Sequence, residues 1–324
     1  MANEVIRTDM KNSNEVFQQI LLKAVKYASV FEQAGLVLKA KTTGHDYVSW
    51  FRVTRLDPGT PTQLQDGVNP AATAVATEKY TAQIGWYGAY AKISAAAKKI
   101  DPVKIVAGFT KAIGELARET REIIIRNAYL SNSSNTFYAG SVAGGRTDVL
   151  GVVTDTDLKK IFRTMEKAGC EKITKIVKAG AGQNTYPVEA CYLMYVSPDQ
   201  AMDVRGITGF LKVAEYSNPE VAFEGEFGSV HGFRFISTNF LTGAVLLGGG
   251  SGTDTGKQAT DSYCDVHRAI VIGQEGLGVA DLDGGIENII MSEEQVGGPL
   301  KQFSTTGYKM AMTTKVVNTN AVLI

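Results

Sequence analysis

The sequence lacks an excess of charge of either sign, because its 33 Lys and Arg residues balance 33 Asp and Glu residues. Proteins that hold nucleic acid by neutralising phosphates usually carry a basic excess. We therefore expect no tight direct binding of DNA. A net charge near zero also removes long-range self-repulsion, which suits a subunit that packs against many copies of itself.

Long apolar runs and a secretory leader are also missing. No run approaches the ~20 apolar residues that a membrane-spanning helix needs. Residues Met1–Glu4 contain neither a basic nor an apolar leader region, which predicts no signal peptide. Cysteine is scarce, and Cys170, Cys191 and Cys264 are widely spaced and odd in number. They predict no disulfide framework and fit a reducing compartment.

The first third of the chain predicts an arm and a long hairpin. Residues 1–40 begin polar and then take on a helical pattern that ends near Gly35. Residues 45–56 and 73–93 are rich in β-branched and aromatic types, with period-two alternation in the second, which predicts two strands. Turn signals rich in Pro, Gly and Asp separate the strands, so that together they form a hairpin with an irregular tip.

The predicted hairpin raises the question of what covers it. Its strand edges and the aromatic residues Trp50, Tyr80 and Trp86 would be an aggregation hazard on a monomer. The hairpin either folds onto the core of its own chain or lies on a neighbouring copy. The tip contains prolines between 58 and 70 that cannot donate ladder hydrogen bonds. We favour the neighbouring copy.

A long helix is predicted at 101–130. Asp101 and Pro102 form an N-terminal signal, and the helix would be roughly 45 Å long at 1.5 Å per residue. Opposite charges four residues apart support it, among them Glu122 with Arg118 and Arg126. The predicted apolar face consists of Val106, Phe109, Ile113, Leu116, Thr120, Ile124 and Ala128.

The rest of the chain mixes helices and strands without the regular alternation of a doubly wound sheet, which predicts an α+β fold. Helices are predicted from Thr156 to Gly169 and from Ser197, where Pro198 and Gln200 complete a capping box. Strands are predicted at 173–177, 188–196, 233–237, 244–247, 263–272 and 310–317.

The glycine-rich segment Gly248–Lys257 invites comparison with a phosphate-binding loop. That motif needs a glycine, four residues, then Gly-Lys and a hydroxyl residue. Aligned on Lys257, the first glycine position holds Ser251 and the hydroxyl position holds Gln258. The pattern fails at both ends, so we expect a surface loop.

Other residues that could carry chemistry are few and scattered. Cys264 and His267 are three apart, but a zinc site needs three or four ligands. No nucleophile-elbow sequence is present. We therefore expect no catalytic, cofactor-binding or metal-binding residues. The remaining histidines, His45 and His231, are expected to be structural, and the acidic pairs Asp281 with Asp283 and Glu293 with Glu294 to be solvated turns.

Five stretches, from about residue 40 to the C-terminus, occur in an order and spacing that resemble tailed-phage major capsid proteins. The most specific stretch is 223–235, in which Gly-Glu-Phe-Gly is followed by Gly-Phe-Arg. The stretch at 64–70 resembles the acidic-Gly-x-x-Pro turn of that family's extended loop. The other stretches are 85–94, 197–203, and 298–302 with 307–309.

The resemblance implies the caudoviral major capsid fold, an α+β fold. Its parts would be an N-terminal arm at 1–40, an extended loop formed by the long β-hairpin at 41–95, a peripheral domain at 96–150 and 262–324 with a spine helix at about 101–130, and an axial domain at 151–261.

The implied function is that of a structural major capsid protein. Such subunits self-assemble into hexamers and pentamers of an icosahedral head that encloses the DNA genome, without tight sequence-specific binding. The chain would assemble in the host cytoplasm and end in the virion capsid, with no contact with a membrane. Because it lacks a long charged helical N-terminal segment, a separate scaffolding protein is expected, with a portal and a decoration protein as further partners.

Three other functions remain open on the sequence. A shell subunit of a non-viral protein nanocompartment would share the fold, and genomic neighbours would separate the two. A soluble α+β enzyme would place its site at the 248–257 loop and would need Lys257. A minor decoration protein would be a monomer or trimer that adds to a preformed shell.

Overall fold

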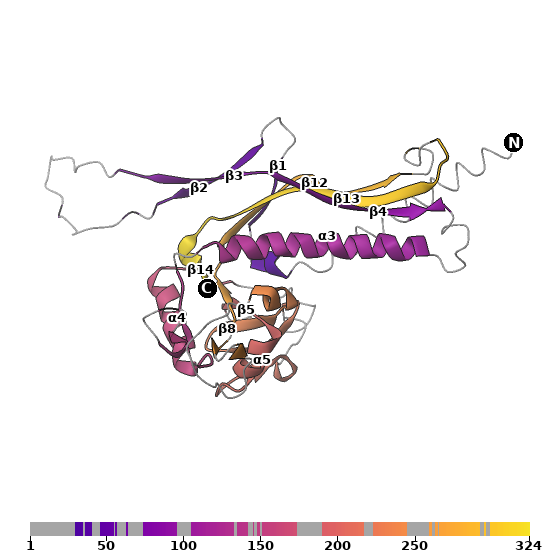
Figure 1. Ribbon diagram of the computed structural model, residues 1–324. Coiled ribbons are helices and arrows are strands. Elements are labelled where there is room, and N and C mark those ends of the chain that lie inside the picture. Colours follow the sequence, from indigo (N-terminus) through magenta and orange to yellow (C-terminus); the bar gives the residue numbers. More distant parts are fainter. Residues whose placement is uncertain are drawn as a thin grey trace, which may run out of the picture.

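The computed structural model describes residues 30–34, 36–40, 46–54, 56, 63, 74–95, 105–132, 135–141, 145, 148–149, 151–173, 190–216, 223–244, 259–260, 263–264, 266–291, 295 and 299–324. The fold is mixed α+β. It consists of an elongated body, built from one long helix beneath a sheet, a compact second body near one end of that helix, and a hairpin that extends from the sheet (Figure 1).

The elongated body contains a four-stranded sheet. Its strand order is β1 (Leu36–Ala40), β12 (Leu277–Met291), β13 (Phe303–Val316) and β4 (Gly85–Ser94). β1 runs parallel to β12 and the other pairs are antiparallel. The long strand β12 was not predicted, because Asp281, Asp283 and the following glycines resemble a turn. The structure instead has a register shift between Asp281 and Ile286, and a strand accommodates such an irregularity locally.

The helix α3 (Ile105–Leu130) lies along one face of this sheet, against β13 and β4. It confirms the helix predicted at 101–130, of which residues 101–104 lie outside the described ranges. Its buried side differs from the predicted one. Ile113 is buried, whereas Phe109 and Leu116 are 41% and 42% exposed. Apolar residues occur on both sides of α3, so their spacing alone did not indicate which side faces the sheet.

The second body contains a six-stranded sheet. Its order is β14 (Val322–Leu323), β11 (Ile270–Ile272), β5 (Tyr192–Val196), β8 (Phe233–Ser237), β7 (Glu226–Val230) and β6 (Leu211–Lys212). The helices α4 (Asp155–Lys167) and α5 (Pro198–Arg205) pack on one face of it. Both begin at a capping box, formed by Thr154 and by the predicted Ser197. Ile125 and Tyr129 of α3 cover the other face.

Several predicted strands need correction. The strand expected at 263–272 is two strands, β10 (Tyr263–Cys264), which pairs with β9 (Ala259–Thr260), and β11. Ala244 ends a 3-10 helix (Asn239–Ala244), and 245–247 lie outside the described residues. Ile173 forms an isolated bridge with Cys191. Other 3-10 helices span Phe31–Ala34, Ala139–Ser141, Val213–Glu215 and Thr319–Ala321.

The predicted hairpin is present but shorter than expected. β2 (Tyr47–Val53) pairs with β3 (Thr77–Gln83), whereas β4 joins the four-stranded sheet. The segment 73–93 is thus divided between two sheets at Ile84. Most of the tip lies outside the described residues. Within the described part of the chain, no helix is both long and apolar enough to cross a membrane.

Candidate assembly surfaces

The hairpin β2–β3 has one face anchored on its own chain. Trp50 is only 5% exposed, and it lies against Gly278 of β12, where an added Cβ would be 2.6 Å from the indole Cε2. Ala280 and Val317 complete this contact. Arg52 donates a hydrogen bond from Nη1 to Asn318 Oδ1 at 2.9 Å. The base of the hairpin is therefore fixed to the sheet, and the concern that Trp50 would be exposed is not borne out, because a glycine leaves room for it.

The opposite face of the hairpin is open. Tyr47, Phe51 and Val53 alternate along β2 and are 61%, 70% and 64% exposed. The ammonium group of Lys79 lies 5.7 Å from the centre of the Phe51 ring, but it does not cover the ring. Large apolar side chains that stay exposed together are typical of surfaces that bind another protein.

A second apolar surface lies on the face of the four-stranded sheet that is turned away from α3. Trp86 and Tyr90 of β4 are 59% and 67% exposed. Lys309 of β13 places its ammonium group 4.3 Å from the Trp86 ring centre, and Lys92 lies 5.0 Å from the ring of Phe303. This surface combines aromatic rings with positive charge.

A buried ion-pair cluster joins the start of the described chain to both α3 and β12. Arg121 donates from Nη1 and Nη2 to the two carboxylate oxygens of Asp281, at 2.9 and 2.8 Å, and from Nε to Glu32 at 2.6 Å. Burial opposes the charged guanidinium, but the hydrogen bonds and negative charges of both acids raise the pKa of Arg121. The prediction that Asp281 lies in a solvated turn is wrong, because a long-range partner holds it inside the sheet.

Further hydrogen bonds fix the segment 30–34, which we call the arm base. The Val30 amide donates to Glu122 Oε1 at 2.9 Å, and the Tyr195 hydroxyl donates to the Val30 carbonyl at 2.9 Å. Burial raises the pKa of Tyr195, so the hydroxyl stays a donor. Glu122, predicted as an opposite-charge partner of Arg118 and Arg126, is fully buried. Sequence spacing contained no signal for these contacts, because the paired residues are 92 and 165 positions apart.

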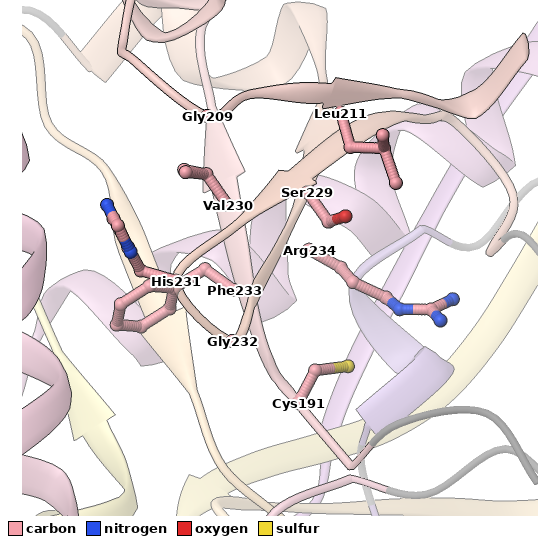
Figure 2. Close-up of a pocket in the computed structure, with 9 residues that line it drawn as sticks. All are labelled: Cys191, Gly209, Leu211, Ser229, Val230, His231, Gly232, Phe233 and Arg234. Atoms are coloured by element: carbon pink, nitrogen blue, oxygen red, sulfur yellow. The ribbon is translucent and has the colours of Figure 1, made fainter. Parts of the chain in front are cut away.

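A small pocket with a volume of about 200 Å³ lies beside the β7–β8 hairpin (Figure 2). Ser229, Arg234 and Cys191 lie on one side of the hairpin, and His231 points away from them. The Cys191 thiol donates weakly to the Ile173 carbonyl, and the Arg234 guanidinium pairs with Glu226 at 3.4 Å. These groups already have partners within the chain, and the arrangement contributes to packing of the sheet.

His231 and His267, the two histidines in the described ranges, have structural partners. His231 Nε2 contacts Asp155 Oδ1, which joins the β7–β8 turn to the start of α4. The hydrogen bond from Lys159, more than that of His231, lowers the pKa of Asp155. His267 Nδ1 lies 3.4 Å from the Ser197 hydroxyl in the α5 cap, a weak hydrogen bond.

Of the residues predicted as chemical candidates, the structure brings none together into a reactive site that can be described. Cys264 lies in β10, and within the described ranges no group of three or more His, Cys, Asp or Glu residues could hold a metal ion. Asp283 lies in β12, but its side chain is outside the description. His45, the 248–257 loop and the pair Glu293 and Glu294 also lie outside the described residues.

The comparisons with known proteins give a family model and several similar shell structures. A family model described as phage capsid protein matches residues 77–323. No curated protein matches the chain. The capsid of the cyanophage P-SCSP1u is similar in structure, with a TM-score of 0.60, 12% identity, and coverage of 91% of this chain and 87% of the other. The capsid of Ralstonia phage GP4 has a TM-score of 0.58, 16% identity, and coverage of 89% and 87%.

One of the similar structures is described as a virus-like particle and not as a phage capsid. A virus-like particle from Pyrococcus furiosus has a TM-score of 0.50 and 13% identity, with coverage of 95% of this chain and 97% of the other. Identities at this level show the fold alone. The family model is the finding that separates the two classes of shell.

Proposed function

The chain belongs to the phage capsid protein family, and we propose that its copies form the hexamers and pentamers of an icosahedral phage head around the DNA genome. It is a structural major capsid protein of the virion, with the fold that tailed-phage capsids share. Assembly would take place in the host cytoplasm.

The observation that carries this proposal is the contrast between the two faces of the hairpin. One face is anchored to β12 through Trp50, and the rest of the hairpin extends away from the sheet (Figure 1). The other face exposes Tyr47, Phe51 and Val53. An isolated two-stranded hairpin is marginally stable in water, and open strand edges recruit other chains. A neighbouring copy of this chain would supply the missing cover.

We assign the parts of the fold as follows. The arm at 1–40, the extended loop at 41–95 and the peripheral domain at 96–150 and 262–324 would form the contacts between copies. The axial domain at 151–261 would lie around the capsomer axis. The six-stranded sheet supports one refinement of these bounds. β11 (270–272) and β14 (322–323) fall in the range of the peripheral domain, but they complete this sheet and would therefore belong to the axial domain.

The partners we propose are other copies of the chain, a separate scaffolding protein, a portal and a decoration protein. The balance of 33 basic and 33 acidic residues supports enclosure of DNA without tight sequence-specific binding. We also propose that the chain has no enzymatic activity, cofactor or membrane contact. Lys257→Ala should leave folding and assembly unchanged, and loss of a tight nucleotide affinity in this variant would contradict that view.

The nanocompartment alternative is not favoured, because the family model that matches describes phage capsid proteins. Negative-stain microscopy of the purified protein, alone and with scaffold supplied, tests assembly directly. Shells or capsomers are expected. A chain that stays monomeric under all these conditions would contradict the proposal.

The role of the hairpin is tested by surface substitutions and by a deletion. Phe51→Ser combined with Tyr47→Ser should leave thermal unfolding of the monomer nearly unchanged, because both side chains are exposed. Particle yield should fall sharply. Gln83→Ser, an exposed position on the same hairpin, is the matched control and should assemble normally. Deleting 58–69 should likewise spare the monomer and block shell closure, and normal particle yield would refute the role of the hairpin.

A further inference from the structure

The outer edge of β4 is unpaired within the described part of the chain. β4 is the last strand of the four-stranded sheet, and on its other side it pairs with β13 without a register shift. It has 10 residues, no proline and one charged residue, Lys92. Natural proteins usually protect an edge strand with prolines, several charges, bulges or short length. An edge this long and regular is therefore able to pair with a strand of another molecule.

The backbone groups that point to this edge belong to every second residue. The Ala95 amide, one residue beyond β4, donates to the Gln302 carbonyl at 2.8 Å. Along an antiparallel strand, the backbone groups of successive residues point to opposite sides. The odd-numbered residues of β4 therefore point their backbone groups toward β13, and the even-numbered residues point theirs to the open edge. All of the even-numbered residues are exposed, namely Trp86, Gly88, Tyr90, Lys92 and Ser94.

A second copy of β4 offers the same groups, so the edge can pair with itself. An antiparallel partner has to bring its even-numbered residues opposite even-numbered ones, and a two-fold axis perpendicular to the sheet does this. Such a contact is isologous, because the same patch is used on both copies. Two registers of this kind pair the most residues, one centred on Ala89 (residues 85–93) and one centred on Tyr90 (residues 86–94).

Side-chain size on the face turned away from α3 favours the register centred on Ala89. It places Tyr90 opposite Gly88 of the other copy, so that the ring covers a position without a side chain. It also places Trp86 opposite Lys92, where the ring and the ammonium group attract each other. The register centred on Tyr90 would instead set that ring against its own copy and would leave Gly88 opposite Lys92.

The side of the sheet that faces α3 fits the same register. Tyr87 would lie opposite Ala91 and Ile93 opposite Gly85, so each larger side chain meets a small one. α3 packs mainly against β13, one strand in from the edge. The two copies of α3 would lie three strand spacings apart, roughly 14 Å, whereas packed helices lie about 8–10 Å apart. The helices therefore leave room for the strands to meet.

We propose that β4 of one copy pairs antiparallel with β4 of a second copy about a two-fold axis at Ala89, so that the two four-stranded sheets become one continuous sheet. This inference rests on the proposed self-assembly and specifies one contact within it. An icosahedral shell contains two-fold axes, and the contact would join neighbouring capsomers there.

The register is tested by cross-linking two differently tagged copies in a Cys264→Ser background. One copy carries Trp86→Cys and the other Lys92→Cys, and they are assembled together and oxidised. Opposed residues in this ladder would have Cα atoms about 5.5 Å apart, which suits a disulfide, so a cross-link between the two tags is expected. Each variant assembled alone is the matched control and should not cross-link, because its two cysteines would be six residues apart along the strands, roughly 20 Å.

Two outcomes of the cross-linking separate this inference from the proposed function. Particles that form without the 86–92 cross-link, or with equal cross-linking in the single-variant controls, would overturn the pairing and leave the proposed function intact. Failure of the unsubstituted chain to form capsomers or shells under the same conditions would contradict the proposed function itself.

Charge gives a second readout. Trp86→Lys sets two like-charge pairs with Lys92 across the axis, whereas Trp86→Gln removes the ring without adding charge. Relative to Trp86→Gln, the Lys variant should lower particle yield about tenfold, equivalent to about 1.4 kcal/mol and within the reach of two cross-strand charge pairs. Adding Lys92→Glu should restore the yield. Equal yields from Trp86→Lys and Trp86→Gln, or no recovery in the double variant while its monomer unfolds at an unchanged temperature, would overturn the pairing.

Discussion

The six-stranded sheet and the hairpin β2–β3 contain similar residues but bury them very differently. Phe233 and Phe235 of the sheet are fully buried, with α4 on one face and α3 on the other. Tyr47 and Phe51 of the hairpin are more than half exposed, because only one face has cover. The difference lies in the number of layers that the chain itself provides.

That difference separates folding from association. In the six-stranded sheet, aromatic side chains stabilise the subunit before it meets any partner. In the hairpin, the same residue types contribute little until a second molecule covers them. Substitutions in the two regions should therefore affect different observables, and four changes test this, beginning with the largest expected effect on the stability of the monomer.

Phe233→Ala should be the most damaging. The ring lies 5.8 Å from Phe162 and 6.1 Å from Tyr192, centre to centre, and its removal leaves a cavity. The free energy of unfolding should fall by about 4 kcal/mol, as measured by urea denaturation. The matched change Phe51→Ala on the hairpin should cost less than about 0.5 kcal/mol. Equal losses at the two positions would remove the contrast.

Arg121→Met should have the second-largest effect on the stability of the monomer. It leaves Glu32 and Asp281 without the cation that both face in a nearly buried site, which should cost about 3 kcal/mol. Arg52→Ala, which breaks one hydrogen bond to Asn318 on the hairpin, should cost only about 1 kcal/mol. Thermal unfolding of the two variants compares them. A milder effect at Arg121 than at Arg52 would show that the ion-pair cluster does not hold the arm base.

Gly278→Ala should disturb the joint between the two regions. The added methyl group would lie 2.6 Å from Trp50, so the base of the hairpin has to move. This should lower the free energy of unfolding by about 2 kcal/mol. Trp50 fluorescence in a Trp86→Phe background reports the shift. Gly151→Ala, where no atom lies within 4 Å of the new methyl group, is the control. Unchanged Trp50 emission in Gly278→Ala would argue against the anchor.

Asp155→Asn should have the smallest effect on stability, and the effect should appear only at acidic pH. The lowered pKa of Asp155 means that its contribution to stability is present above its ordinary value of 3.8 and is lost as the pH falls through the lowered pKa. Asp155→Asn should therefore flatten the loss of thermal stability below about pH 4. If the loss of thermal stability at acidic pH is the same in Asp155→Asn as in the unchanged protein, the contacts of Asp155 with Lys159 and His231 do not contribute to stability.

The sequence predicted those parts of the fold that depend on neighbouring residues. The cap at Ser197, the length of α3 and the strand pair β2–β3 follow from local spacing and turn chemistry, whereas the helix α4 begins at a cap on Thr154, two residues before the predicted start at Thr156. The predictions that were wrong concern residues whose partners lie far away in the sequence. Asp281 resembles a solvated turn until Arg121, 160 positions away, is placed beside it. The exposure of Phe109 and Leu116 on α3 was missed for the same reason. Spacing shows which residues share one side of a helix, but it does not show which side packs against the rest of the chain.

The expectations about the surfaces are confirmed only in part. Sequence indicated a hairpin that needs cover, and the structure divides its aromatic residues between its own chain, which covers Trp50, and solvent, which Phe51 faces. Gly278 made the first outcome possible, and nothing near Trp50 in the sequence indicates it. Contact with a neighbouring copy and the dispensability of the 248–257 loop remain predictions.

The path of the main chain connects the two bodies in the folded subunit and also affects the order in which they can form. β11 lies in the six-stranded sheet, β12 and β13 in the other, and β14 returns to pair with β11. Neither sheet can come apart without pulling on strands of the other, so the described body should melt in one cooperative transition. During synthesis, the outer edge of β11 has to wait for residues 322–323 to emerge, and until then the nascent subunit keeps an unpaired strand edge that chaperones could protect.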